Sequence, residues 1–433
     1  MRRLLLAAVS VMCAVSAKAT KFEVSTDHAD CRYDVNKKAT FTVTVTDDEG
    51  KALNEGEVTW SLDNFGTKTI DAGGKVALAA ANPFKVSGAL AEPGFLRLNL
   101  ATADGKAKRV WSVAVAPEKI QASAPRPRDF DKFWTDAKRK LEKEVPLDAR
   151  MELDPAKSTG KMNYYRVSFA TWGGARVYGF YTEPKDASKR YPALVVVPGA
   201  GPYHQGSWFG GDRHVSLMLN VLPFSPFTDK ETFQKNYSEW NSGTMKKWGV
   251  KGQYGAAGIA SSREDFVFYP ILLGMSRAVD WLAARPTVDK KRIGYFGGSQ
   301  GGAFGYMLLG VNKNFTRGAM YVPAMCDHLG ADLGRATGWP NLIASQSEDR
   351  RERAKKFAPY FDAANFAAAI KVPVRSVVGL SDTTCPPYGG WSAFNALKSA
   401  DKRMESIPGM THSVKGSIAG SLQWWALGTD PAK

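Results

Sequence analysis

The sequence predicts an α/β fold, with a mostly parallel sheet covered by helices on both faces, preceded by a small all-β domain. Two observations support this prediction. Short strands with alternating apolar and polar residues, separated by turn residues, occupy residues 20–118. Continuous apolar strands alternating with helical stretches follow, which is typical of a parallel sheet buried on both faces. With 433 residues, the chain is also long enough for two hydrophobic cores.

The first 19 residues have the pattern of a secretory signal peptide. Arg2 and Arg3 precede an apolar run, residues 4–15, that is too short to span a bilayer, and Ala17-Lys18-Ala19 fits a cleavage site. We therefore expect export to the periplasm or the medium, with a mature chain that begins near Thr20. No later segment predicts membrane insertion.

Residues 20–118 have the pattern of a small immunoglobulin-like β-sandwich. Residues 41–46 and 96–100 alternate as strands with one buried face do, and turns are expected at residues 47–50 and 71–74. We expect a structural role for this domain. Carbohydrate binding is the functional alternative, because a sandwich fold alone does not define a function.

Charge and cysteine content limit the classes of function. The formal net charge is +16 at pH 7, with basic residues spread along the chain. This fits a solvated basic surface or, alternatively, attraction to acidic material such as polysaccharide that carries uronic acids. No spacing predicts nucleic-acid, metal or cofactor binding.

After the signal peptide only three cysteines remain, Cys31, Cys326 and Cys385. The sequence is compatible with a disulfide bridge between Cys326 and Cys385, and equally with both of them being buried free thiols.

Residues 119–433 predict the α/β domain. A proline-containing linker ends near Pro127, and an amphipathic helix is expected over residues 130–144. A second helix is expected over residues 271–284, between the expected strands 193–197 and 292–296. Three apolar runs are expected to be strands of the buried sheet: residues 193–197, 292–296 and 372–380.

The segment Gly297-Gly298-Ser299-Gln300-Gly301 carries the strongest chemical signal. It follows an expected strand and precedes a helical run, which is the context of a nucleophile elbow in the α/β-hydrolase fold. In such a turn bulky neighbours would collide with the strand and the helix, and flanking glycines remove that crowding. We therefore expect Ser299 to be a nucleophile on this fold.

A serine nucleophile needs an acid and a base, which follow it in the chain in this fold. Asp382 comes just after the expected strand 372–380, where a carboxylate can orient an imidazole; a turn or helix cap is the alternative. His412 is the one histidine that follows it, and it is the expected base. The other four histidines are His28, His204, His214 and His328.

The oxyanion hole is expected to combine two backbone N–H groups. One belongs to Gln300, directly after the nucleophile. The other comes from the turn Pro198-Gly199-Ala200-Gly201 after an earlier strand, with Ala200 preferred and Gly201 next.

An aromatic segment, residues 203–248, follows this turn and is a candidate to cover the site. Aromatic faces stack on sugar rings, while a lid with its own small core is the alternative. His328, elsewhere in the chain, is also a candidate for substrate contact. The residues expected to contact substrate here are Gly201, Tyr203, His204 and Trp208.

Several motifs over residues 126–427 carry a family resemblance: Asp129-Phe130-Asp131-Lys132-Phe133-Trp134, Val288-Asp289-Lys290-Lys291-Arg292-Ile293, Gly298-Ser299-Gln300-Gly301-Gly302, Tyr360-Phe361-Asp362-Ala363-Ala364-Asn365-Phe366-Ala367, and Val378-Gly379-Leu380-Ser381-Asp382 with Cys385-Pro386-Pro387. In these stretches the chain resembles the acetyl xylan esterase and cephalosporin C deacetylase family (carbohydrate esterase family 7). The resemblance implies hydrolysis of acetyl esters on sugars without a cofactor. It assigns Ser299 as nucleophile, Asp382 as acid and His412 as base.

Two motifs depart from that family's pattern. Its Arg-Gly-Gln motif is absent after the strand expected over residues 216–222, and Lys251-Gly252-Gln253 occurs later; its His-Glu pair is His412-Ser413 here. The oligomeric state therefore stays open. An esterase for larger acyl groups, a peptidase of the same fold and an inactive glycan-binding protein are the alternatives to a deacetylase.

Overall fold

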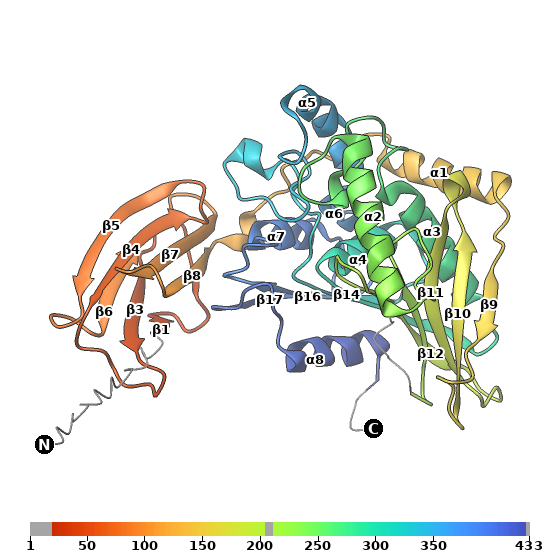
Figure 1. Ribbon diagram of the computed structural model, residues 1–433, viewed down its shortest axis with the longest axis horizontal. Coiled ribbons are helices and arrows are strands. Elements are labelled where there is room, and N and C mark those ends of the chain that lie inside the picture. Colours follow the sequence, from red (N-terminus) through yellow and green to blue (C-terminus); the bar gives the residue numbers. More distant parts are fainter. Residues whose placement is uncertain (1–19, 204–210, 430–433) are drawn as a thin grey trace, which may run out of the picture.

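The computed structural model describes residues 20–203 and 211–429. A β-sandwich at the N-terminal end and a larger α/β domain are joined by a linker (Figure 1). Within the described ranges, no helix combines the length and apolar character needed to cross a membrane.

The sandwich is built from two sheets with immunoglobulin-like topology. The first two strands belong to different sheets, and β2 pairs in parallel with the last strand, β8. Inward side chains of β3, such as Phe41 and Val43, are fully buried between the sheets. One sheet contains β1(Lys21–Thr26), β3(Ala39–Thr46) and β6(Phe84–Gly88); the other contains β2(Arg32–Tyr33), β8(Lys108–Val115), β7(Gly94–Thr102), β4(Glu57–Asn64) and β5(Thr69–Ala77).

The prediction of a turn at residues 71–74 is wrong. These residues lie inside β5, where a register shift against β4 marks a β-bulge. Gly73 has φ of 80°, and a Cβ there would lie 1.6 Å from the carbonyl oxygen of Trp60. The glycines that suggested a turn therefore allow the bulge, and the chain reverses between β4 and β5 at residues 65–68.

The α/β domain contains a nine-stranded sheet in the order β17-β16-β15-β14-β12-β13-β11-β10-β9. Strands from β13 through β12 to β17 pair in parallel, whereas β11, β10 and β9 form an antiparallel edge. This confirms the predicted, mostly parallel sheet. The strands are β9(Arg150–Leu153), β10(Met162–Ala170), β11(Arg176–Pro184), β12(Tyr191–Val197), β13(Val215–Leu219), β14(Val288–Gly298), β15(Arg317–Tyr321), β16(Val374–Gly379) and β17(Lys402–Ile407).

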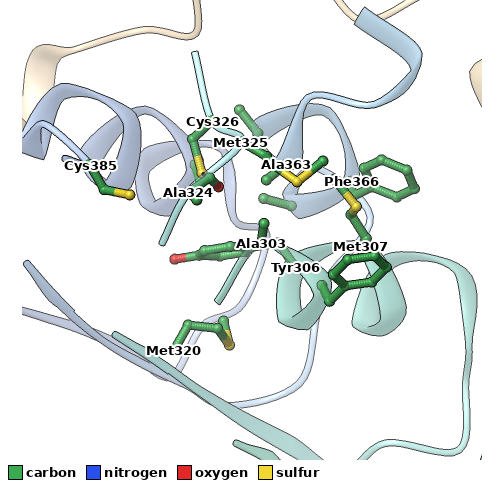
Figure 2. Packing of buried hydrophobic residues seen from close by; sticks show 14 of the residues in the cluster. Ala303, Tyr306, Met307, Met320, Ala324, Met325, Cys326, Ala363, Phe366 and Cys385 are labelled. Carbon is green, nitrogen blue, oxygen red and sulfur yellow. Dashed lines mark hydrogen bonds between the residues drawn. The ribbon is translucent and has the colours of Figure 1, made fainter. Parts of the chain in front are cut away.

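Helices cover both faces of this sheet (Figure 1). Alternate residues of β12 belong to separate cores, Val195 to the larger one and Leu194 to the one under α8. The larger core holds α4 against α6, with Tyr306, Met307 and Phe366 packed between them (Figure 2). The helices are α1(Phe130–Glu144), α2(Lys230–Trp248), α3(Phe268–Ala283), α4(Gln300–Val311), α5(Glu348–Phe357), α6(Ala363–Ala367), α7(Pro387–Ala396) and α8(Gly416–Leu427), with short 3-10 turns η1(Pro117–Lys119), η2(Trp172–Gly174), η3(Tyr254–Ala256), η4(Gly330–Leu333) and η5(Ala358–Tyr360).

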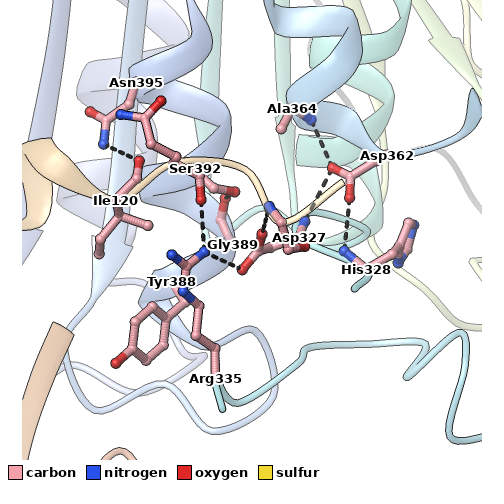
Figure 3. A network of polar contacts seen from close by, with 12 residues as sticks. Ile120, Asp327, His328, Arg335, Asp362, Ala364, Tyr388, Gly389, Ser392 and Asn395 are labelled. Atoms are coloured by element: carbon pink, nitrogen blue, oxygen red, sulfur yellow. Dashed lines mark hydrogen bonds and ion pairs between the residues drawn. The ribbon is translucent and has the colours of Figure 1, made fainter. Parts of the chain in front are cut away.

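The linker is fixed to the α/β domain by hydrogen bonds rather than free of it. The Ser123 backbone N–H donates to Asp327 at 2.7 Å. The Asn395 side chain of α7 donates to the carbonyls of Pro117 and Ile120, each at 2.9 Å (Figure 3). The sandwich therefore approaches the other domain along α7, the helix that follows the predicted catalytic acid.

Candidate active site

Ser299 occupies a strained turn between β14 and α4. Its φ of 55° and ψ of −122° are rare for a residue with a side chain. Two backbone hydrogen bonds hold it there, because the Ser299 N–H donates to Tyr321 O and the Ala324 N–H donates to Ser299 O, each at 3.0 Å. The surrounding structure thus compensates for the strain and keeps the hydroxyl in place.

The glycines next to Ser299 are required by contacts with their neighbours. A Cβ on Gly298 would lie 2.0 Å from the ring of Tyr321. A Cβ on Gly301 would lie 2.0 Å from the carbonyl oxygen of Val197, at the end of β12. Real Cβ atoms do not approach other atoms so closely, so both positions need glycine for the elbow to form.

Ser299, His412 and Asp382 form a continuous hydrogen-bonded chain. The Ser299 Oγ lies 2.9 Å from Nε2 of His412, and Nδ1 of the same ring lies 2.8 Å from Oδ2 of Asp382. A carboxylate at Nδ1 favours the tautomer in which Nε2 accepts a proton. The structure therefore brings together the three residues that sequence analysis selected, and their geometry suits removal of the serine proton.

Asp382 is fully buried and held by its own loop. Its Oδ1 accepts the backbone N–H groups of Thr384 and Cys385, each at 2.9 Å. The loop is also tied to the segment before His412, because the Ser381 N–H donates to Met410 O at 3.0 Å. The acid and the base are thus positioned by one connected pair of loops, and 30% of the His412 side chain remains exposed for substrate.

The predicted oxyanion residues lie on both sides of the serine. Gln300 begins α4, where the first N–H groups have no partner within the helix. The turn that contains Ala200 passes close to the nucleophile, since a Cβ on Gly199 would lie 3.6 Å from Cβ of Ser299. Both backbone segments are therefore close enough to Ser299 to supply donors.

Tyr254 is a site residue that sequence analysis missed. It is fully buried, and its hydroxyl accepts a hydrogen bond from the Gln300 side chain at 3.1 Å. Burial raises its pKa, with the hydrogen bond to Gln300 and one from the Gly201 backbone acting against this rise. Tyr254 therefore connects the two sides of the predicted oxyanion hole. The signal that could have found it is its place directly after Lys251-Gly252-Gln253.

The late position of Lys251-Gly252-Gln253 has a structural explanation. Helix α2 lies between β13 and this segment, which delays it in the sequence but returns it to the site. Gln253 Oε1 accepts the indole N–H of Trp339 at 2.7 Å, next to the loop that contains Cys385.

The thiols of Cys31, Cys326 and Cys385 are buried and free, so the bridge considered between the last two is not formed (Figure 2). Burial raises the pKa of the Cys385 thiol, which lies within hydrogen-bonding reach of Ser299. Burial also raises the pKa of Cys326. Both thiols therefore stay protonated near neutral pH, and Ser299 is the available nucleophile.

The predicted substrate contacts have different outcomes. Tyr203 is 42% exposed, and its hydroxyl would lie 3.4 Å from a Cβ on Gly199, beside the nucleophile turn. Gly201 lies in the same turn, whereas His204 and Trp208 fall outside the described residues.

His328, a candidate for substrate contact from the sequence, is a buried residue in this structure, which disfavours that role. It is 5% exposed, and burial lowers its pKa to about 4. Its backbone N–H donates to Asp362 at 2.7 Å, in a network that also includes the N–H groups of Asp327 and Ala364 (Figure 3). An isolated histidine in the sequence does not reveal this burial.

The aromatic residues that follow the oxyanion turn pack mainly on one another. The rings of Phe224 and Phe233 are 5.3 Å apart, and Trp240 lies 4.8 Å from Tyr254. In the described part of this segment, the small-core alternative therefore accounts for these rings, whereas Tyr203 is exposed beside the nucleophile turn.

The sheet, the elbow and the serine–histidine–aspartate chain define an α/β-hydrolase of the carboxylic ester hydrolase class. More narrowly, the chain belongs to the acetyl xylan esterase family, which matches residues 118–426. The match begins after the last strand of the sandwich.

Individual relatives agree with this membership. The acetyl esterase Axe7A of Xylanibacter ruminicola is 26% identical over 329 residues, which are 75% of this chain and 72% of the relative. Solved acetyl xylan esterases from a Paenibacillus and a Thermoanaerobacterium species have TM-scores of 0.60 and 0.58, at 21% and 22% identity. Each comparison covers 72% of this chain and 98% or 96% of the solved chain, and both show the α/β-hydrolase fold.

Proposed function

We propose that this esterase removes acetyl groups from acetylated sugars or polysaccharides such as xylan, through an acyl-enzyme on Ser299. The observation that carries the proposal is the hydrogen-bonded chain from Ser299 through His412 to Asp382 on a nucleophile elbow. The substrate class is supported by family membership and by the acetyl ester named for the relatives.

The first half of the reaction forms the acyl-enzyme. Nε2 of His412 accepts the hydroxyl proton while Ser299 Oγ bonds to the acetyl carbonyl carbon. The backbone N–H groups of Gln300 and Ala200 hold the resulting oxyanion. When the carbonyl reforms, the bond to the sugar oxygen breaks, and His412 gives its proton to that oxygen.

The second half repeats these roles with water. His412 removes a proton from water, which attacks the acetyl carbon, and acetate leaves as Ser299 regains its proton. Asp382 keeps the imidazole in the required tautomer and orientation, since its other oxygen is held by two backbone N–H groups.

Acetate release from acetylated xylan by the purified mature chain tests the substrate class. We expect turnover of acetylated xylan and 4-nitrophenyl acetate, and loss of nearly all of it in Ser299→Ala. Preference for long acyl, feruloyl or peptide substrates would favour the enzyme alternatives. Failure of a fluorophosphonate to label Ser299, together with absence of turnover, would favour an inactive glycan-binding protein.

The signal-peptide pattern supports a place of action in the periplasm or outside the cell, where plant polysaccharide is accessible. N-terminal sequencing of the protein recovered after export should give a chain that begins near Thr20. Recovery of the uncleaved chain from the cytosol alone would contradict this localisation.

A further inference from the structure

A surface pocket of about 340 Å³ lies between the C-terminal end of α2 and helix α5, and none of the triad residues lines it. The charged and aromatic residues that line it are Lys247 and Trp248 of α2, with Asp349, Arg350 and Arg353 of α5. In Figure 1, α5 and this end of α2 lie together at the top of the α/β domain. The volume is within the range of small-ligand sites, which begins at about 300 Å³.

The pocket has an excess of positive charge. Three cationic side chains line it, against the single carboxylate of Asp349. Within the described part of the chain, neither Arg350 nor Arg353 forms an ion pair, whereas several other arginines pair with an aspartate. Two unpaired guanidinium groups in one pocket favour an anionic ligand.

The two arginines are held in place by backbone carbonyl groups. Arg350 Nη1 donates to Trp248 O, and Arg353 Nη2 donates to Ser261 O at 3.0 Å. Gly249 permits the first contact, because a Cβ there would lie 2.9 Å from Nη1 of Arg350. Each guanidinium has five N–H donors, so these single contacts orient the groups and leave donors for a carboxylate.

Trp248 gives the pocket an aromatic surface next to these cations. Its indole is half-buried, and the Lys247 ammonium lies 4.9 Å from the ring centre. Aromatic faces accept the apolar faces of sugar rings, while arginine binds a planar carboxylate in a bidentate manner. We propose that this pocket binds a uronic acid unit of an acidic, acetylated polysaccharide. This inference rests on the proposed deacetylase function.

The pocket is connected to the active site through a short piece of chain. After Trp248, the Lys251 N–H donates to Ser345 O at 2.9 Å, and three residues later Tyr254 contacts Gln300 beside the nucleophile. The proposal therefore places the uronic acid of a polymer in this pocket and an acetylated unit of the same polymer at Ser299.

The test compares acetylated glucuronoxylan with the same polymer after chemical reduction of its uronic carboxyl groups. The Arg350→Gln/Arg353→Gln variant should raise KM for the acidic polymer about tenfold, as expected for loss of a charge-assisted contact. Its KM for the reduced polymer and its rate on 4-nitrophenyl acetate should stay near those of the unaltered enzyme. Lys247→Gln, which leaves both arginine contacts intact, should raise KM for the acidic polymer by a smaller factor.

Arg351→Gln is the matched control, because Arg351 is on the same helix and exposed but does not line the pocket. If Arg351→Gln raised KM for the acidic polymer as much as the double variant does, the proposed binding site would be refuted. The effect would then come from diffuse surface charge. Equal KM values for the acidic and reduced polymers with the unaltered enzyme would also refute the proposed binding site.

Failure of the deacetylase proposal would appear differently, as no acetate from either polymer. The pocket is then tested by calorimetric titration of Ser299→Ala with an aldouronic oligosaccharide. Binding that the two arginine substitutions abolish would support the pocket, and absence of binding would overturn it.

Discussion

Replacing Tyr388 by phenylalanine tests whether the sandwich stabilises the catalytic domain. The Tyr388 hydroxyl donates to Asn64 Oδ1 of β4 at 2.6 Å, and the same oxygen accepts the Phe95 N–H at 3.2 Å. Tyr388 is 1% exposed and Asn64 is 5% exposed, so water cannot replace the lost donor. In Tyr388→Phe, the Asn64 Oδ1 still accepts the Phe95 N–H but loses the Tyr388 hydroxyl. We therefore expect the free energy of unfolding to fall by about 1–2 kcal/mol.

The ring of Tyr388 contributes separately from its hydroxyl. It packs edge-on against Phe95 with ring centres 4.9 Å apart and an interplanar angle of 89°. The Phe substitution keeps this contact, whereas Tyr388→Ala removes it and leaves a cavity. The expected loss for Tyr388→Ala is therefore about 3–5 kcal/mol.

The assay is equilibrium unfolding in urea of Tyr388→Phe, Asn64→Ala and the double variant. If the hydrogen bond couples the domains, the double variant should lose less stability than the sum of the two single losses, by about 1 kcal/mol. Strict additivity, within about 0.5 kcal/mol, would refute the direct interaction.

Tyr237→Phe is the matched control, because the Tyr237 hydroxyl has no hydrogen-bond partner among the described residues and lies on α2, outside the domain contact. It should change stability by less than about 0.5 kcal/mol. Turnover of 4-nitrophenyl acetate by Tyr388→Phe should be nearly unchanged under native conditions, because Asp382 is held by its own loop.

Three further predictions concern the site and its surroundings. Gly301→Ala should reduce kcat at least about a hundredfold, because its Cβ would lie 2.0 Å from a carbonyl oxygen of β12; wild-type kcat in a variant that stays folded would contradict the steric argument. Tyr254→Phe should lower kcat on 4-nitrophenyl acetate about tenfold with KM little changed, because Gln300 loses a buried partner; a change in KM alone would assign Tyr254 to substrate binding instead. Burial lowers the pKa of His328 to about 4, below the unfolded value near 6.5, so the folded state binds fewer protons between these values. His328 therefore contributes stability above pH 6.5 that is lost as the pH falls toward 4, by about 3 kcal/mol. Urea unfolding at several pH values should show that His328→Gln removes this part of the acid dependence, and an unchanged dependence would contradict its burial in the neutral form.

Local pattern was enough to predict the main elements of the fold. The expected helix over residues 130–144 has the bounds of α1, because its apolar residues recur at helical spacing. The elbow was also predictable, since the strand, the glycines and the helix around Ser299 are adjacent in sequence. Asp382 and His412 followed from chain order and from the small number of histidines.

Features that depend on distant contacts were not predictable. Gly73 could belong to a turn or to a bulge, and only the pairing of β5 with β4 decides between them. Tyr254 meets Gln300 because α2 returns the chain to the site, and the adjacent motif Lys251-Gly252-Gln253 does not by itself establish this distant contact. The burial of His328 depends likewise on the Asp362 loop packed against it.

The most direct measurement of the central claim is identification of the residue that becomes acetylated during turnover. The enzyme is mixed with 4-nitrophenyl acetate, quenched in acid within the first turnover and mapped by peptide mass spectrometry. We predict one acetyl group on the peptide that contains Ser299, and none on that peptide in Ser299→Ala. An acetyl group on another residue that forms at the catalytic rate, or full turnover by Ser299→Ala, would contradict the account.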